Sequence, residues 1–320
     1  MSDIFYEDVK VDSKMIEEVE KNLEIKSNVP LNYLPIEYTT LGRFDCPAKL
    51  HFRDFLFDES MKLGLSTSET ALNNIIKILN KACFEKFDCQ KMHEKELEET
   101  LLNLFFNFWG KQIEKAFPFT EEELQEYSEQ DIKSLGYVNI DFSMIKTDTI
   151  DPKIKKHIAI EYKGITYTFR FPQVGAILKA QEYVATKFRE QYQSIVSIEN
   201  KLKKKLVLTK EEQDTYSDYL EDSSLTLLMA TQAQNIVSID NEEFITFEDQ
   251  LKAYPRIGTQ LWGKYAEELS KIKFGVNNLI KVKHPMTNKP VERRFLFQFL
   301  DFIPGNGVQD SSGFTVSFRD

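Results

Sequence analysis

The sequence predicts an α+β fold, with small antiparallel sheets near residues 30–57, 137–171 and 279–303 and helical blocks between them. Two observations predict this class. Short segments in which apolar and polar residues alternate, as in half-buried strands, are bounded by proline or glycine. Longer segments repeat their apolar residues every three or four positions, as amphipathic helices do.

The composition indicates which classes of protein and partner fit the chain. Hydrophobic residues make up 42% of the 320 and 25 are phenylalanine, which is typical of a folded chain and not of a disordered one. A formal net charge of −10 at pH 7 disfavours nucleic acid as a partner, because an acidic surface repels a phosphate backbone. No uncharged apolar run approaches the roughly 18 residues of a membrane span. We therefore expect a soluble intracellular protein without a membrane partner.

The first part of the chain is predicted to contain a helix and a small sheet. Residues 1–29 are charged but carry a thin apolar stripe at helical spacing, which indicates a docking helix. In the segment KLHFRDF, Leu50 and Phe52 alternate with basic or histidine residues in the period of a half-buried strand. This strand belongs to a region, residues 30–135, in which a small sheet is followed by a helix pair.

The helix pair is predicted from two apolar faces. Ser66 and Glu69 have the spacing of a capping box ahead of the segment TALNNIIKILNKAC. The second helix should extend from about residue 92 to residue 116, because Leu101 and Phe108 lie on one broad apolar face. We expect the two helices to pack together.

The middle of the chain is predicted to begin with a hairpin. The segment HIAIEYKGITYTFRFP alternates on both sides of Lys163 and Gly164, and glycine tolerates the positive φ of a hairpin turn. Pro172 ends the second strand because it cannot extend the ladder. A helix over residues 174–198 should follow.

The rest of this region, which spans residues 136–303, is predicted to be helical until a final pair of strands. The segment SSLTLLMATQAQNIV places Leu225 and Leu228 on the apolar side of one helix. The segment ERRFLFQFLDFIP is apolar on both faces, so this strand is either buried between layers or bound to another chain. Residues 304–320 form a polar tail with a β-prone end, which suits strand addition to a partner as well as a loose terminus. The candidate partner-binding residues are Phe295, Phe297, Phe299, Phe302, Phe314, Val316 and Phe318.

Sequence motifs of enzymes are absent. The chain has no glycine-rich phosphate-binding motif and no G-x-S-x-G nucleophile elbow. His93-Glu94 matches the start of the zinc motif H-E-x-x-H, but Leu97 replaces the second histidine, so we interpret His93 as a surface residue in a helix's first turn. The lysine run of residues 201–205 is interpreted as a solvated helix end. We expect no catalytic, cofactor-binding or metal-binding residue, no cofactor and no enzymatic activity.

The cysteines and their polar neighbours leave one alternative open. The three cysteines are odd in number and lack C-x-x-C spacing, which favours free thiols in a reducing compartment over disulfides. An enzyme with an unrecognised site would need several polar residues to converge in a cleft. The residues considered for such a cleft are Cys46, His51, Arg53 and Asp54.

The order of these segments resembles a known family. The segment LPIEYTTLGRFDCPAKLHFRDF, two apolar helices, the segment YKGITYTFRFPQVGAILKAQEYV and a strand pair ending FLFQFLDFIP resemble the baseplate-hub and tail-assembly proteins of contractile-tailed bacteriophages of the T-even type. The resemblance covers about residues 30–303. Members of that group often carry paired cysteines in a small hairpin before the final aromatic strand, like a zinc ribbon. Here the hairpin reads KHPMTNKPVERRF, with His284 and no cysteine, which puts a structural zinc in doubt.

The resemblance implies a function without catalysis. It implies a structural or assembly protein of the hub region of a phage tail baseplate, which binds other tail or baseplate proteins. The chain would then lie in the virion tail or, during assembly, in the host cytoplasm. A host-directed adaptor that binds a cellular protein through its aromatic strand or its lysine run, and the enzyme described above, are the alternatives.

Overall fold

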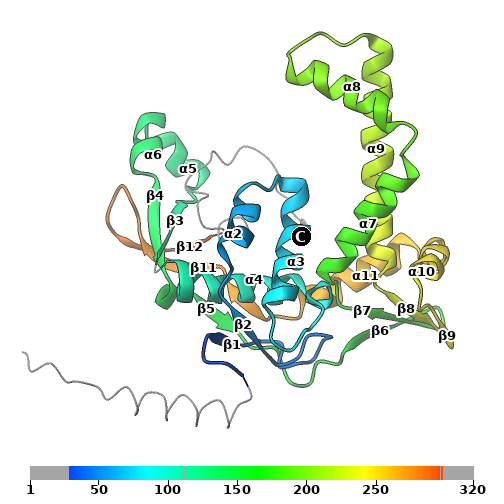
Figure 1. The fold of residues 1–320 in the computed structure, drawn as a ribbon, viewed down its shortest axis with the longest axis horizontal. Helices are drawn as coiled ribbons and strands as arrows, with labels where there is room; N and C mark the ends of the chain where they lie inside the picture. The colour runs from blue at the N-terminus through cyan, green and yellow to red at the C-terminus, as the bar shows by residue number, and fades with distance from the viewer. Residues whose placement is uncertain (1–28, 111, 296, 298–320) are drawn as a thin grey trace, which may run out of the picture.

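The computed structural model describes residues 29–110, 112–295 and 297, and within them the α+β prediction is confirmed. Helices surround small antiparallel sheets, most of which are strand pairs (Figure 1). Two clusters of buried apolar side chains hold the body together, and a helical arm extends from the body (Figure 1). The helix predicted in residues 1–29 lies outside the described residues, apart from residue 29, as does the tail of residues 304–320.

The first region combines the start of the chain with its last described strands. Its strands form the antiparallel pairs β1–β2, β3–β4, β5–β10 and β11–β12. The strands are β1 (Tyr33–Glu37), β2 (Lys49–Arg53), β3 (Gln112–Ala116), β4 (Tyr137–Asp141), β5 (Lys146–Asp148), β10 (Gly275–Asn277), β11 (Leu279–Lys283) and β12 (Pro290–Arg294). The helices are α2 (Phe57–Gly64), α3 (Ser68–Ala82), α4 (Glu94–Leu104), α5 (Glu121–Glu126) and α6 (Glu129–Leu135), with short turns η1 (Cys89–Lys91), η2 (Phe105–Trp109) and η3 (Phe142–Met144).

The first core lies where β2, α3 and α4 meet. Leu50 and Phe52 are fully buried on β2, as their alternation predicted, and Ile75 and Leu79 form the buried side of α3. Burying a side chain of this size contributes roughly 1.5–3 kcal/mol. Ile280 of β11 packs in the same core, so the C-terminal strand pair shares its core with the start of the chain and not with the hairpin.

Two predicted helix boundaries in this region are wrong. The N-cap of α3 is Thr67, paired with Thr70, so the helix begins one position after the predicted capping box. The helix predicted up to residue 116 ends at Leu104. A short π-helix, η2, follows it, and β3 then begins at Gln112. Gly110 has extended backbone angles (φ −167°, ψ 154°), and the segment after it pairs with β4 instead of continuing the helix.

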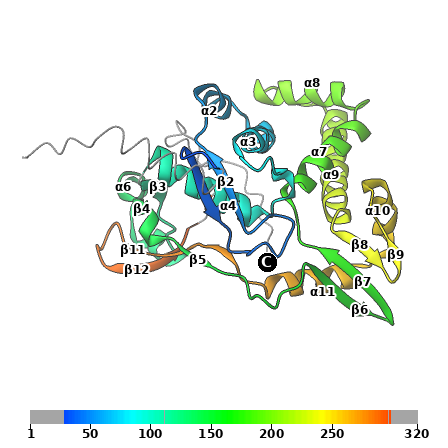
Figure 2. The ribbon, with the colours of Figure 1, turned by 60° about the horizontal axis from the view of Figure 1, so that its bottom comes forward.

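The second region is built on a four-stranded antiparallel sheet in the order β6-β7-β8-β9. The strands are β6 (His157–Tyr162), β7 (Ile165–Arg170), β8 (Ile236–Ile239) and β9 (Glu242–Glu243). The helices are α10 (Phe247–Ala253) and α11 (Thr259–Ser270), with the short turn η4 (Tyr254–Arg256) between them. This sheet lies at the opposite end of the body from β3, β4, β11 and β12 (Figure 2).

The predicted hairpin is confirmed. β6 pairs with β7 in register from Tyr162 opposite Ile165, and both turn residues have positive φ, 53° at Lys163 and 78° at Gly164. A two-residue loop with positive φ at both positions matches the right-handed twist of its strands. Phe169 is fully buried on β7, where its ring lies 4.7 Å from that of Tyr265 in α11.

The arm consists of three helices, α7 (Val174–Lys187), α8 (Tyr192–Lys203) and α9 (Lys210–Ala233). α7 leaves the body, α8 crosses the tip and α9 returns beside α7 to the sheet (Figure 1). The prediction of one helix over residues 174–198 is wrong, because a break separates α7 from α8. The break spans residues 188–191, which is about the length of one helical turn. The apolar residues before and after it therefore keep helical spacing in the sequence. Among the described helices, none has both the length and the apolar character needed to cross a bilayer.

α9 packs against the other two helices of the arm through a narrow seam. Between Glu212 and Thr226, only five residues are not exposed, and they recur at alternating steps of four and three, the spacing of a coiled-coil seam. These residues are Glu212, Tyr216, Tyr219, Ser223 and Thr226. Closer to the body, the seam continues with Ala230 and Ala233, which are fully buried. In this part of the seam the small side chains of the alanines face α7, and Leu225 and Leu228 of α9 are left exposed.

Candidate functional site

The predicted partner-binding residues lie partly in the core and partly outside the described chain. Phe295 is 2% exposed, and its ring packs edge-on against Phe117, so it supports the fold of this chain instead of facing a partner. Phe297 is partly buried against the same core. The other candidates, Phe299, Phe302, Phe314, Val316 and Phe318, lie outside the described residues.

The four residues considered for an enzyme cleft do not come together. Cys46 is 1% exposed in the first core, where burial raises the pKa of its thiol. His51 binds the carboxylate of Glu85, with 2.6 Å between Nδ1 and Oε1. Arg53 makes a two-pronged contact with Glu59, at 2.8 and 2.9 Å, and so anchors the first turn of α2. The carboxylate of the fourth residue, Asp54, accepts the N–H of the next residue along the chain.

The joint between β7 and α7 lies where the two cores meet. Pro172 separates the two elements, and the backbone N–H of Val174 donates to the carbonyl of Met92 in the first core, at 2.9 Å. Gly175 is required in the first turn of α7, because a Cβ there would lie 2.8 Å from the carbonyl oxygen of Gln90. The joint therefore couples the sheet of the second core to the body of the first.

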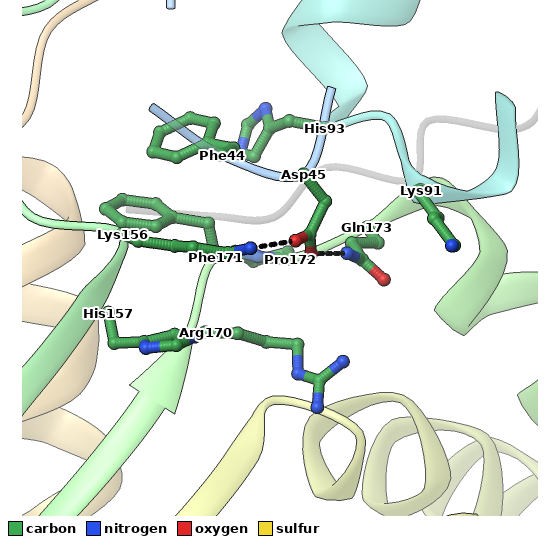
Figure 3. Close-up of a pocket in the computed structure, with 10 residues that line it drawn as sticks. All are labelled: Phe44, Asp45, Lys91, His93, Lys156, His157, Arg170, Phe171, Pro172 and Gln173. Atoms are coloured by element: carbon green, nitrogen blue, oxygen red, sulfur yellow. Dashed lines mark hydrogen bonds and ion pairs between the residues drawn. The ribbon is translucent and has the colours of Figure 1, made fainter. Parts of the chain in front are cut away.

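A small hollow beside this joint is lined by charged residues, two of which, Asp45 and Lys156, form an ion pair (Figure 3). Asp45 is at its centre, and its carboxylate accepts hydrogen bonds from Lys156, at 2.5 Å, and from the amide of Gln173. Lys91 and His157 complete this part of the lining. This pairing makes the hollow a structural junction, and no nucleophile lies beside a free base among its lining residues.

His93 is not the surface residue that the sequence indicated. It is the N-cap of α4, its Nδ1 accepts the N–H of Lys95 at 3.1 Å, and its ring contacts those of Phe44 and Phe274. Burial lowers the pKa of His93 to about 3, because the charged imidazolium is poorly solvated there. The imidazole is therefore neutral at physiological pH and acts as a helix cap.

Buried carboxylates hold the loop after β1 against α4. The side chain of Glu99 accepts hydrogen bonds from both the N–H and the hydroxyl of Thr39. That hydroxyl also accepts the N–H of Gly275, at 3.0 Å. Glu96 accepts the hydroxyl of Thr40 at 2.6 Å, and burial raises the pKa of Glu96 from 4.5 to about 7. Sequence reasoning missed this network, although acidic residues spaced on the apolar side of a helix are a usable signal.

His284 packs among aromatic rings, and within the described residues it belongs to no group that could hold a metal ion. It is 3% exposed and its ring lies 4.7 Å from that of Phe117. Its Nδ1 accepts the N–H of Met286 at 3.1 Å, and its Nε2 lies 3.3 Å from the carboxylate of Glu123. In the part of the chain that the structure describes, no group of three or more histidine, cysteine or acidic residues could hold a metal ion.

The arm exposes several large apolar side chains. Leu225 and Leu228, predicted on the apolar side of one helix, are 63% and 47% exposed on α9. They lie three positions apart and are therefore neighbours on the helix surface. At the tip, Leu206 and Val207 are also exposed. We call these four residues the arm surface.

The lysine run borders the arm surface at the tip. Lys203 ends α8, Lys204 and Lys205 are exposed in the turn that follows, and Lys201 pairs with Glu212 of α9. The predicted solvated helix end is therefore confirmed. Cations at a helix C-terminus are favourable because they face the negative end of the helix dipole.

Comparison of the chain with models of known protein families, with curated proteins and with solved structures found no match.

Proposed function

We propose that this chain is a non-enzymatic structural or assembly protein that acts through protein–protein contacts in the hub region of a phage tail baseplate. The arm surface supports the contact-forming role. The resemblance of the sequence to baseplate-hub and tail-assembly proteins supports the phage setting. On this proposal, the partners are other tail or baseplate proteins.

The observation that carries the contact-forming role is that α9, near the base of the arm, buries Ala230 and Ala233 and leaves Leu225 and Leu228 exposed. A single exposed leucine is ordinary on a protein surface. Here Leu225 and Leu228 are adjacent on a helix that extends from the body, and Val207 at the tip is 92% exposed. Neighbouring apolar side chains on an extended element are typical of a surface that another protein covers.

The setting is tested by quantifying the protein in purified phage particles by mass spectrometry, relative to the known tail proteins of the same phage. A fixed stoichiometry in small multiples of three or six supports a built-in baseplate component. Absence from particles, with the protein bound to baseplate intermediates in infected cells, supports an assembly factor. Association with a host protein alone, and with no tail protein, would contradict the proposal.

The contact-forming role is tested with the double variant Leu225→Ser and Leu228→Ser. We expect it to lose co-purification with tail proteins while its circular dichroism spectrum stays unchanged. The matched control is Leu65→Ser, because Leu65 is 79% exposed on the body, away from the arm. Equal loss of binding in the control and the double variant would mean that the arm surface is not the contact.

A further inference from the structure

A second hollow, which we call the amide hollow, lies at the base of the arm and shares Arg170 and Gln173 with the lining of the hollow in Figure 3. It encloses about 80 Å³ of free space, enough for several waters or for a small organic group. α7, the loop after α9 and α10 contribute to its walls. Its polar lining consists of Arg170, Gln173, Lys179, Gln234, Asn235 and Gln250.

Asn235 is the clearest sign that this hollow is built to bind something. It is only 6% exposed, and its backbone is held by bonds to Arg170 and Gln232. Its side-chain amide has no hydrogen-bond partner in the described part of the chain, yet it lines the hollow. A carboxamide can make up to four hydrogen bonds, so the side chain of Asn235 is available to bind a ligand or water in the hollow.

Two buried glutamines, Gln234 and Gln250, line the same space and have acceptors without a partner. The amide nitrogen of Gln234 donates to the carbonyls of Ala176 and Ala230, at 2.8 and 3.0 Å. The amide nitrogen of Gln250 donates to the carbonyls of Ile236 and Phe244. Both amide groups are thereby fixed in orientation, and their Oε1 atoms accept no hydrogen bond from the described residues. The amide hollow therefore presents two acceptors that require N–H or O–H donors.

The other side of the amide hollow is cationic. The Nε of Arg170 is buried without a partner, and Figure 3 shows its guanidinium lying apart from the carboxylate of Asp45. Lys179 makes no ion pair within the described residues and lines the same space. The N-cap of α7, Gln173, gives no side-chain cap, so the positive end of the α7 dipole adds to this charge. An oxyanion is the partner that these groups require.

We propose that the amide hollow binds an α-carboxylate together with its neighbouring N–H, as the last residue of a polypeptide or a free amino acid presents them. The carboxylate would pair with Arg170 and Lys179. The N–H would donate to the fixed oxygens of the two glutamines. A bare oxyanion fits less well, because those oxygens would face a negative charge without a donor between them. Capture of a chain end is a known mode of peptide recognition.

The proposal rests on the proposed function only for the identity of the partner, whose chain end would be the ligand. The binding chemistry can be tested on the purified full chain. The probes are N-acetylglycine, glycine, acetate and N-acetylglycinamide. The readout is an NMR titration that follows the Nε–H signal of Arg170 and the side-chain amide signals of Asn235.

We expect N-acetylglycine or glycine to shift these signals at millimolar concentration. Acetate should bind at least about tenfold more weakly, because it lacks the N–H, and N-acetylglycinamide should not bind. Tighter binding of N-acetylglycine than of glycine assigns the site to a chain end, and the reverse assigns it to a free amino acid. Equal binding of acetate and N-acetylglycine, or no shift with any probe, overturns the proposal.

Variants locate the binding to the amide hollow. Asn235→Asp keeps the size of the side chain and adds a negative charge, so we expect at least a tenfold loss of affinity. The matched control is Asn200→Asp, the same change at an exposed position of α8. Lys179→Gln, on the exposed side of α7, provides a second test if Asn235→Asp does not fold. Unchanged affinity in both hollow variants overturns the proposal, and neither result depends on whether the protein is found in phage particles.

Discussion

The two cores and the arm of this protein use their apolar residues in opposite ways. The cores bury phenylalanine and branched aliphatic side chains, with Phe52 and Phe169 fully enclosed. Near the base of the arm, α9 instead buries Thr226, Ala230 and Ala233 and leaves Leu225 and Leu228 in solvent, and the arm buries large apolar side chains closer to its tip, at Phe188, Ile195 and Ile198. Hydrophobic spacing therefore indicates where an apolar face lies on a helix, but not whether that face turns toward the chain's own core. The exposed leucines of the arm are available to a partner because the seam does not need them.

The largest expected effect is in a core. Phe169→Ala removes a ring packed between Trp262 and Tyr265, and should lower the free energy of unfolding by about 3–5 kcal/mol. Chemical denaturation measures this change. The control is Phe57→Ala, whose ring is 83% exposed and whose loss should cost less than about 0.5 kcal/mol. Similar losses in the two variants would mean that burial of the Phe169 ring in the second core does not contribute the expected free energy of unfolding.

A smaller effect is expected in the seam of the arm. Ala230→Leu puts a large side chain at a fully buried position of the seam, and should destabilise the arm by about 1–3 kcal/mol. Hydrogen exchange should become faster in α7 and α9 while protection in α3 stays the same. Ala185→Leu, on the exposed side of α7, is the control. If Ala230→Leu left exchange unchanged, the seam would be looser than its buried alanines indicate.

The pH dependence of stability probes the buried carboxylates that hold the loop after β1 against α4. Burial raises the folded-state pKa of Glu96 from 4.5 to about 7, so the folded chain binds more protons than the unfolded chain across that window. Stability should therefore be greatest at the acid end of the window and fall as the pH rises through it. Glu96→Gln should make this slope shallower in urea titrations at several pH values. An unchanged slope would show that Glu96 does not contribute to it.

The smallest effect on stability is expected on the arm surface. Leu225→Ser and Leu228→Ser should each change the free energy of unfolding by less than about 0.5 kcal/mol, because both side chains are already in water. Thermal denaturation of the isolated protein measures this directly. A loss of several kcal/mol would place these leucines in a core, and would remove the contrast between arm and body.

The sequence predicted local elements better than their surroundings. The hairpin around Gly164 followed from alternation and turn chemistry, both of which act between near neighbours. The helix predicted up to residue 116 failed because β3 is fixed by pairing with β4, more than twenty residues later. Phe295 was read as a binding residue because alternation cannot show that Phe117 covers its ring.

The amide hollow could not have been predicted. Asn235, Gln250 and Arg170 come from separate parts of the chain, and single asparagines or glutamines form no recognisable motif. Their role depends on which side-chain amide nitrogens donate to backbone carbonyls. Those hydrogen bonds form only when β8, α9 and α10 are in place. Local spacing carries no information of this kind.

The length of α9 gives the arm a mechanical property. Its 24 residues span about 36 Å, so a rotation of one degree at the base moves the tip by about 0.6 Å. Gln234 clamps that base by bridging the carbonyls of Ala176 on α7 and Ala230 on α9. The arm is thus a lever with this carboxamide among the contacts at its base, and a displacement too small to disturb either core would be magnified into a change of position at Val207.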